Sequence, residues 1–166
     1  EDFFSVEATR GREFILRLPH EADPIKAIEN FARTKGIRFG KVHAAYMGAF
    51  KPARFLVWTP DTANPANWHH EEPMEVQNLN MLLSCAGQIG IKKNFEGEEQ
   101  SFVALHFVTG GGWNVPTIGG HLVEGTKVAG VMAFYVTEIL GIDVILPSPD
   151  ESVKHGDFPE NWYEEI

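Results

Sequence analysis

The chain contains a single cysteine, Cys85, among its 166 residues. One cysteine excludes an intrachain disulfide and a zinc site built from several thiolates. Because Cys85 lies inside the apolar run MLLSCAGQIG, its surroundings favour a small buried side chain over a reactive thiol. The scarcity of cysteine also fits a reducing compartment, so we expect a cytoplasmic protein.

Long hydrophobic runs are absent as well. No apolar stretch approaches the roughly 18 residues that a membrane-spanning helix needs. The first residues, EDFFSVEATRGR, lack a basic stretch followed by an apolar one, so we expect neither a secretory signal nor a membrane partner. With 43% hydrophobic and 22% charged residues, the composition is that of a globular protein whose length suits one domain.

Positive charge is scarce, because 14 lysines and arginines face 23 acidic residues, giving a net charge of −9. This balance excludes a nucleic-acid footprint over the whole surface, and we do not expect the isolated chain to bind DNA directly. Basic residues outnumber acidic ones only up to Arg54. A local basic face near Arg33, Lys35, Arg38 and Lys41 is one interpretation of that excess, and we favour the solvated end of a helix.

One helix is well specified by its ends. Asp23 can cap it, Pro24 suits its first position, and Gly36 suits a left-handed stop. Between them, apolar residues recur with helical spacing in IKAIENFARTK. The sequence therefore predicts a helix that begins at Pro24 and ends before Gly36.

Most of the remaining chain has the pattern of β-strands. The expected strands cover residues 13–19, 37–50, 54–58, 75–91, 101–108, 118–123, 127–140 and the segment IDVILP. Residues 59–73, TPDTANPANWHHEEP, carry three prolines and predict a long irregular loop. Together these elements predict an α+β fold with a largely antiparallel sheet of seven or eight strands and one main helix. Several strands are apolar on both faces, so one helix leaves sheet surface that a subunit interface would cover.

The stretch ALHFVTGGGWNVPTIGGHLVEG, residues 104–125, joins two apolar runs that each contain one histidine. A hairpin centred between Trp113 and Asn114 places His106 opposite His121. Directly opposed Cβ atoms lie about 4.5–5.5 Å apart, so the two imidazoles could share one metal ion. The alternative is that a neutral imidazole donates a hydrogen bond to a carbonyl.

Further residues complete the predicted site around this histidine pair. The third donor is left open among His43, His69, His70, another subunit and water. The predicted pocket beside the pair comprises Ala104, Trp113, Gly119, Gly120 and Glu124. For an enzyme, Glu124, Glu75 or another carboxylate would be the candidate general base.

Four segments together resemble a known family. GREFILRLPHEADPIKAIENFARTKGI, EVQNLNMLLSCAGQI, ALHFV and IGGHLVEGTKV resemble, in the right order, the plants-and-prokaryotes conserved (PPC) domain, a family of unknown molecular activity. The resemblance divides the chain into an N-terminal extension (1–10), a PPC-like domain (11–146) and an acidic tail (147–166).

The resemblance implies an antiparallel sheet with a helix, assembled as a homotrimer. It also implies a site of three histidines, of which His106 and His121 match two, whereas Ala104 stands where the family has the third. Plant relatives carry AT-hooks and the family is often labelled DNA-binding. Here TRGRE, residues 9–13, has the Arg-Gly-Arg core of a hook but lacks its following proline and basic flanks.

Three functions follow as hypotheses. The first is a homotrimeric binding or scaffold module of unresolved ligand that holds zinc or another transition metal at His106 and His121. The second is a metal-assisted enzyme acting on a small molecule, and the third is a DNA-associated regulatory protein, as the family label suggests. Whether the chain is an enzyme is left open.

Overall fold

The computed structural model describes residues 5–46, 48–63, 68–70, 72–77, 80–110, 116–144 and 163–165. In these residues, α1 (Pro24–Lys35) is the one helix, and it packs against a large antiparallel sheet. The expected α+β fold with a largely antiparallel sheet is confirmed. No helix in this described part of the chain is long and apolar enough to cross a membrane.

Helix α1 begins and ends where the sequence predicts. The Asp23 carboxylate accepts hydrogen bonds from the backbone N–H of Ile25 at 3.0 Å and of Lys26 at 3.3 Å. At the other end Gly36 has φ 65° and ψ 32° and donates its N–H to carbonyls of the last turn. Both ends are fixed by local chemistry, which is why the sequence alone located them.

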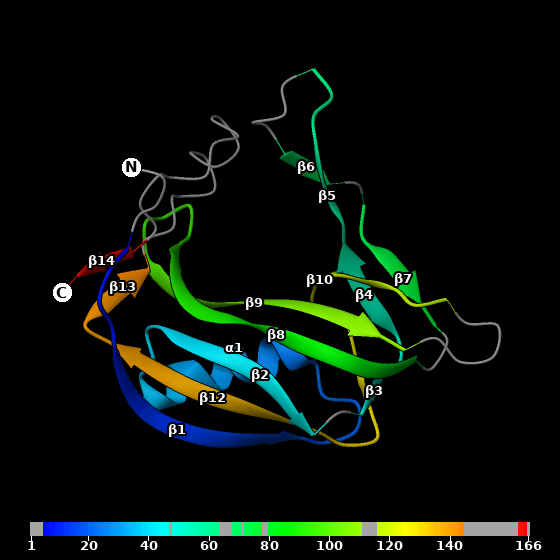
Figure 1. Cartoon of the computed structure of the whole chain (residues 1–166), viewed down its shortest axis with the longest axis horizontal. Helices are drawn as coiled ribbons and strands as arrows, with labels where there is room; N and C mark the ends of the chain where they lie inside the picture. The colour runs from blue at the N-terminus through cyan, green and yellow to red at the C-terminus, as the bar shows by residue number, and fades with distance from the viewer. Residues whose placement is uncertain are drawn as a thin grey trace.

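The main sheet contains ten strands among the described residues. This exceeds the seven or eight strands expected, because some of the long strands predicted from the sequence are divided into shorter ones. Eight of them follow one spatial path (Figure 1). In that order they are β1 (Thr9–Leu18), β12 (Met132–Leu140), β2 (Gly40–Tyr46), β8 (Asn80–Lys93), β9 (Glu99–Thr109), β10 (Gly119–Leu122), β4 (Ala53–Leu56) and β7 (Met74–Val76). Strand β3 (Ala49–Phe50) pairs with both β8 and β11 (Val128–Ala129).

Two small sheets lie outside this path. Strands β13 (Ile142–Val144) and β14 (Tyr163–Glu165) pair with each other, as do β5 (Trp58–Pro60) and β6 (Trp68–His70). Strands β5 and β6 form a narrow ribbon, hereafter the β5–β6 ribbon, which extends away from the main sheet (Figure 1). The prediction that residues 59–73 form an irregular loop is therefore wrong for residues 59–60 and 68–70, whereas residues 61–63, 72 and 73 lie outside any helix or strand. Strands of three residues are too short to show a two-residue alternation, so they left no periodic signal.

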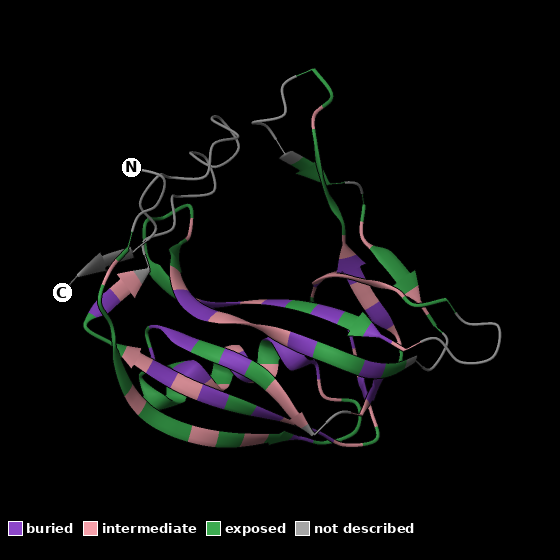
Figure 2. Ribbon diagram, viewed as in Figure 1, coloured by how far each residue is buried: buried purple, intermediate pink, exposed green. Residues whose placement is uncertain are grey.

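The two faces of the main sheet differ in cover. One face packs under α1 and holds the core, which includes Ile28 of the helix together with Val42, Leu105 and Phe134 of the strands. Alternate residues of the same strands point to the opposite face, here called the outer face. The alternation is visible as changing burial along the strands in Figure 2. Cys85 belongs to the buried set, as expected.

Large apolar side chains remain exposed on the uncovered side of the sheet. Ile15 of β1 is 72% exposed, and its partner Tyr135 on β12 is 51% exposed. Leu83 of β8 and Val108 of β9 are also exposed. The sequence analysis expected a subunit interface because several strands are apolar on both faces, and this exposed surface is what such an interface would cover.

Candidate functional site

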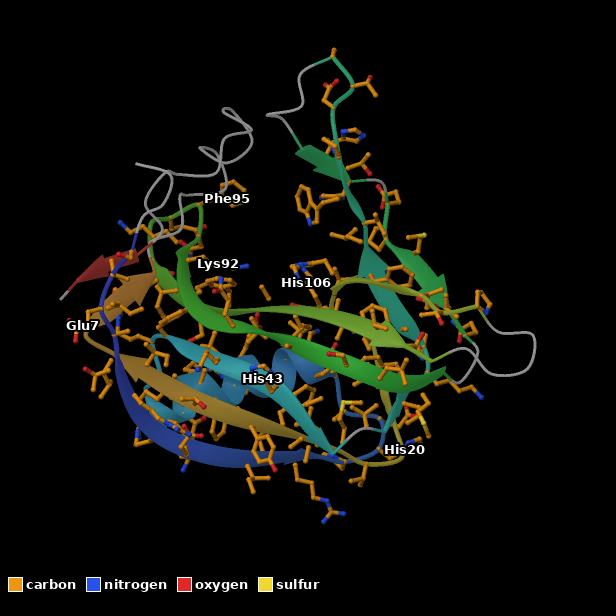
Figure 3. All side chains as sticks on the ribbon, in the orientation of Figure 1. Glu7, His20, His43, Lys92, Phe95 and His106 are labelled. Carbon is orange, nitrogen blue, oxygen red and sulfur yellow. The ribbon has the colours of Figure 1, made fainter. Side chains whose placement is uncertain are left out.

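The predicted register of the histidine hairpin is confirmed. His121 of β10 is the direct partner of His106 on β9, and Gly119 is the partner of Val108. His121 Nδ1 lies 3.2 Å from His106 Nε2, and the ring centroids are 5.2 Å apart. Two residues far apart in sequence thus present converging imidazole nitrogens on the outer face. Figure 3 labels His106 on β9 and shows it well separated from His43 on β2.

Strand β10 is held closely between β9 and β4, and its glycines make this possible. A Cβ atom on Gly119 would lie 2.5 Å from the backbone oxygen of Phe107, and one on Gly120 would lie 2.6 Å from that of Leu56. Neither contact could be relieved without moving backbone. The two glycines before His121 therefore allow the strand to approach both neighbours and bring its imidazole to His106.

The turn that follows β10 is fixed from two sides. The backbone N–H of Gly125 donates to the second carboxylate oxygen of Asp23 at 2.8 Å, which ties the turn to the N-terminus of α1. The buried hydroxyl of Thr126 accepts from the backbone N–H of Arg54 at 3.0 Å, which ties the turn to β4. The strand that carries His121 is therefore fixed at its end by hydrogen bonds to α1 and to the neighbouring strand β4.

A pocket of about 260 Å³ opens beside the histidine pair. Its described lining consists of Leu56, Val57, Trp58, His106, Phe107, Val108, Gly119, Gly120 and His121. Apart from the two imidazoles and the indole, the lining side chains are apolar or absent. The volume is below the roughly 300–1,000 Å³ of pockets for drug-sized ligands, so the pocket suits a smaller molecule.

The pocket contains some of the predicted residues and not others. Gly119 and Gly120 line it, as the sequence predicted. Ala104 lies two residues before His106 on β9 and pairs with Gln88 of β8. It is not among the described residues that line the pocket. The carboxylate of Glu124 lies 3.0 Å from the Lys26 ammonium instead, and Trp113 lies outside the described residues.

The sequence analysis missed the wall formed by Leu56, Val57 and Trp58. These residues come from β4 and β5, and β4 pairs with β10 through Leu56 and His121. The signal that was available is the run of consecutive apolar residues FLVW at 55–58. Such a run fits a strand with apolar surroundings on both faces, but it does not say which strand is its neighbour.

The site favours the neutral form of the His121 imidazole. Burial lowers the pKa of His121, and the positive charges that His106 and His70 can carry lower it further. A neutral imidazole keeps one nitrogen lone pair available, which is the form that binds metals. The same arrangement also permits one ring to donate its N–H to the other.

The other candidate donors lie at different distances from the pair. His43 of β2 pairs with Ala86, which in turn pairs with His106, so His43 is two strands away. His69 and His70 lie on the β5–β6 ribbon. Within the described ranges, no three histidine, cysteine, aspartate or glutamate side chains are grouped closely enough to hold a metal ion.

Two charged residues that the sequence analysis singled out, Glu75 and Arg38, lie in ion pairs. Arg54 lies 3.2 Å from the carboxylate of Glu75, the second candidate base. Arg38, part of the proposed basic face, contacts both Glu99 at 2.7 Å and Asp143. This pairing lowers the pKa of Glu99 through a hydrogen bond from the guanidinium. The basic excess near Arg38 is therefore partly neutralised by acidic residues from later in the chain.

Comparisons with known proteins agree with this architecture. The profile of the Plants and Prokaryotes Conserved (PCC) domain matches residues 5–140. No curated protein sequence matches the chain.

Solved structures share its fold. A plant- and prokaryote-conserved protein from Pyrococcus horikoshii is 21% identical, with a TM-score of 0.71 and coverage of 99% of each chain. A metal-containing protein from Archaeoglobus fulgidus is 22% identical, with a TM-score of 0.71 over 98% of this chain and 100% of that one. A candidate DNA-binding protein from Bacteroides thetaiotaomicron is 16% identical, with a TM-score of 0.59 over 82% and 87% of the two chains.

Proposed function

The chain belongs to the Plants and Prokaryotes Conserved domain family, and from that premise we propose that it is a homotrimeric binding module that holds a transition-metal ion between His106 and His121. The observation that carries the metal site is the separation of 3.2 Å between His121 Nδ1 and His106 Nε2. Two imidazole nitrogens on one tetrahedral zinc ion, each about 2.0–2.1 Å from the metal, lie about 3.3–3.4 Å apart. The histidine pair thus has nearly the spacing that binding requires.

The donor set narrows the choice of metal. Neutral imidazoles suit zinc, copper, iron and nickel, whereas magnesium and calcium prefer oxygen donors. Burial raises the pKa of the Cys85 thiol to about 12, so this residue offers no thiolate. A relative of the same fold, from Archaeoglobus fulgidus, is itself a metal-containing protein. Zinc, supplying Lewis acidity or simply a fixed positive charge when bound, is the first metal to test.

The site supports ligand binding more strongly than hydrolysis. None of the described residues that line the pocket carries a carboxylate to act as general base. Glu75 is paired with Arg54, and Glu124 is paired with Lys26. A metal-assisted enzyme would therefore need one of these ion pairs to open.

Direct DNA binding has less support from the charge distribution. Arg10 is bonded to Glu13, Arg12 to Glu138, and Arg38 to Glu99 and Asp143. Arginines engaged in this way offer fewer contacts to phosphates. We therefore propose that any association with DNA depends on a partner that supplies the basic surface.

The homotrimer is supported by the uncovered apolar side chains of the sheet, including Ile15, Leu83 and Tyr135. Association of identical chains would remove this surface from water. Light scattering across a range of concentrations should give three times the 18.5 kDa chain mass. A protein that stays monomeric at high concentration would exclude this part of the proposal.

Metal content is the decisive test. Tag-free protein should contain close to one transition-metal ion per chain by elemental analysis, and His106→Ala and His121→Ala should each abolish it. His43→Ala is the matched control, because His43 is exposed on the same face and two strands from the pair. The metal site is refuted if wild-type protein binds no metal even after reconstitution, or if both variants retain it.

A further inference from the structure

The main sheet does not provide a third donor beside the histidine pair. Across the strands, His106 is flanked by Ala86 and His121 by Leu56. Along β9, the residues on the same face as His106 are Ala104 and Val108. The residues nearest to the pair within the sheet thus carry no metal-binding side chain, and a third protein donor has to come from another element.

The β5–β6 ribbon reaches the same pocket. Trp58, the first residue of β5, lines the pocket together with His106 and His121. On the ribbon, Trp58 is the direct partner of His70, and their ring centroids are 4.5 Å apart in an edge-to-face arrangement. His70 therefore packs against the side chain that forms one wall of the site.

The other two candidates are excluded by strand geometry. His69 is the partner of Thr59, so its side chain points to the ribbon face opposite to that of Trp58 and His70. His43 is separated from His106 by the whole of strand β8, a distance of about 9–10 Å between strand axes. An ion held at the histidine pair, about 2 Å from each nitrogen, would lie too far from His43, and His69 points to the ribbon face opposite to the one that Trp58 presents to the pocket.

We propose that His70 of the β5–β6 ribbon is the third protein donor to a metal bound at His106 and His121, replacing the sheet histidine whose position is occupied by Ala104. This inference rests on the proposed metal site. The three histidines are not gathered in the described conformation, so the His70 ring must turn away from Trp58 and toward the pair.

The ribbon is suited to that movement. It consists of two strands with three residue pairs, Trp58 with His70, Thr59 with His69 and Pro60 with Trp68. A two-stranded ribbon that lies outside a larger sheet is only marginally stable in water. Closure onto a metal would therefore cost little of the stability of the main sheet, and it would place Trp58 and His70 over the pocket.

Metal affinity of the full chain tests the assignment without any assay of activity. Competition of Co²⁺ or Zn²⁺ with a chromophoric chelator should show that His70→Ala weakens binding at least about 100-fold, the upper end of the loss seen on mutating groups that only support a ligand. His69→Ala is the matched control and should bind within about twofold of wild type. The visible absorption of bound Co²⁺ should also change in His70→Ala, because one nitrogen donor is lost.

Two further variants separate ligation from folding. His70→Phe keeps a ring against Trp58 but removes the donor, so it should lose affinity as His70→Ala does. Ala104→His in the His70→Ala background restores an imidazole on the same face of β9 as His106 and should recover most of the affinity.

The outcomes distinguish the two proposals. Wild-type affinity and an unchanged Co²⁺ spectrum in both His70 variants would refute the role of His70 while leaving the histidine pair intact. Wild-type affinity in His106→Ala would instead refute the metal site itself. Equal losses in His69→Ala and His70→Ala would show that the ribbon acts through its fold and would also overturn the assignment of His70.

Discussion

The two faces of strands β9 and β10 carry opposite roles within the same few residues. Leu105 and Leu122 point into the buried core and are 0% and 1% exposed, whereas their neighbours His106 and His121 point to the outer face and line the pocket. The alternation of a β-strand puts a stabilising residue directly beside a candidate ligand. Stability and binding are therefore separated by face, not by region of the sequence.

This comparison of the two faces also explains why His106 and His121 are aligned although neither side chain has strong local constraints of its own. The buried face supplies the free energy that keeps β9 and β10 in register, and a slip of one residue would expose Leu105 and Leu122. The imidazoles on the other face are aligned as a consequence. Substitutions on the two faces should thus have separable effects.

The largest expected effect is on the buried face. Leu105→Ala should lower the free energy of unfolding by about 2–5 kcal/mol, because it leaves a cavity beneath the helix. Chemical unfolding monitored by circular dichroism measures this loss. Val108→Ala on the outer face of the same strand is the control and should change stability by no more than about 0.5 kcal/mol. Similar losses in the two variants would contradict the division between the faces.

A smaller effect is expected at the link between the helix and the site. Asp23→Ala removes the cap of α1 and the hydrogen bond to Gly125, so it should cost about 1–2 kcal/mol of stability. Asp23→Asn keeps an oxygen that can cap the helix but has only one oxygen to accept from both segments. Its unfolding free energy should lie between those of wild type and Asp23→Ala, and a value equal to wild type would show that the bond to Gly125 is unimportant.

The smallest effect on stability is expected when a single cysteine is moved from the buried face of β8 to its exposed face. The two faces are compared in this case by the rate at which the thiol reacts. Native Cys85 should react slowly with a maleimide at pH 8, because burial raises the pKa of its thiol to about 12. Ser84→Cys in a Cys85→Ala background puts a thiol at an exposed neighbouring position and should react rapidly. Equal rates in the two folded proteins would contradict the assignment of faces.

The pH dependence of stability follows from the same thiol. Its pKa in the folded protein lies above the ordinary value of 9.0, so the unfolded chain releases its proton first as pH rises. The contribution of Cys85 to stability should thus be complete below pH 9 and diminish above it. Unfolding measured from pH 8 to pH 10 should show a steeper decline for wild type than for Cys85→Ala, and parallel curves would refute the effect.

Several elements could be predicted from the sequence because their determinants are local. Asp23, Pro24 and Gly36 specify the ends of α1. The spacing of His106 and His121 about their loop predicted the register that the structure confirms. Enrichment in valine and aromatic residues identified 127–140 as strand rather than helix, and β11 and β12 confirm this.

Other elements escaped prediction because their determinants are not local. The three-residue strands β5 and β6 contain a proline and no full alternation, so residues 59–73 resembled a loop. The pocket wall at Leu56 and Trp58 depends on β4 pairing with β10, two strands far apart in the chain. Nothing in the amino-acid composition of β4 or of β10 indicates which strand it pairs with.

The sequence by itself determined the helix, the strand-forming segments and the pairing of the two histidines, since each depends on short-range spacing, capping or alternation. Only the tertiary structure decided which residues surround that pair. It set His43 two strands away, directed Glu124 to Lys26, and brought Trp58 with His70 beside the pocket. The physical reason is that the order of strands in a sheet is selected by burial of one common face over long sequence separations, which no local pattern encodes.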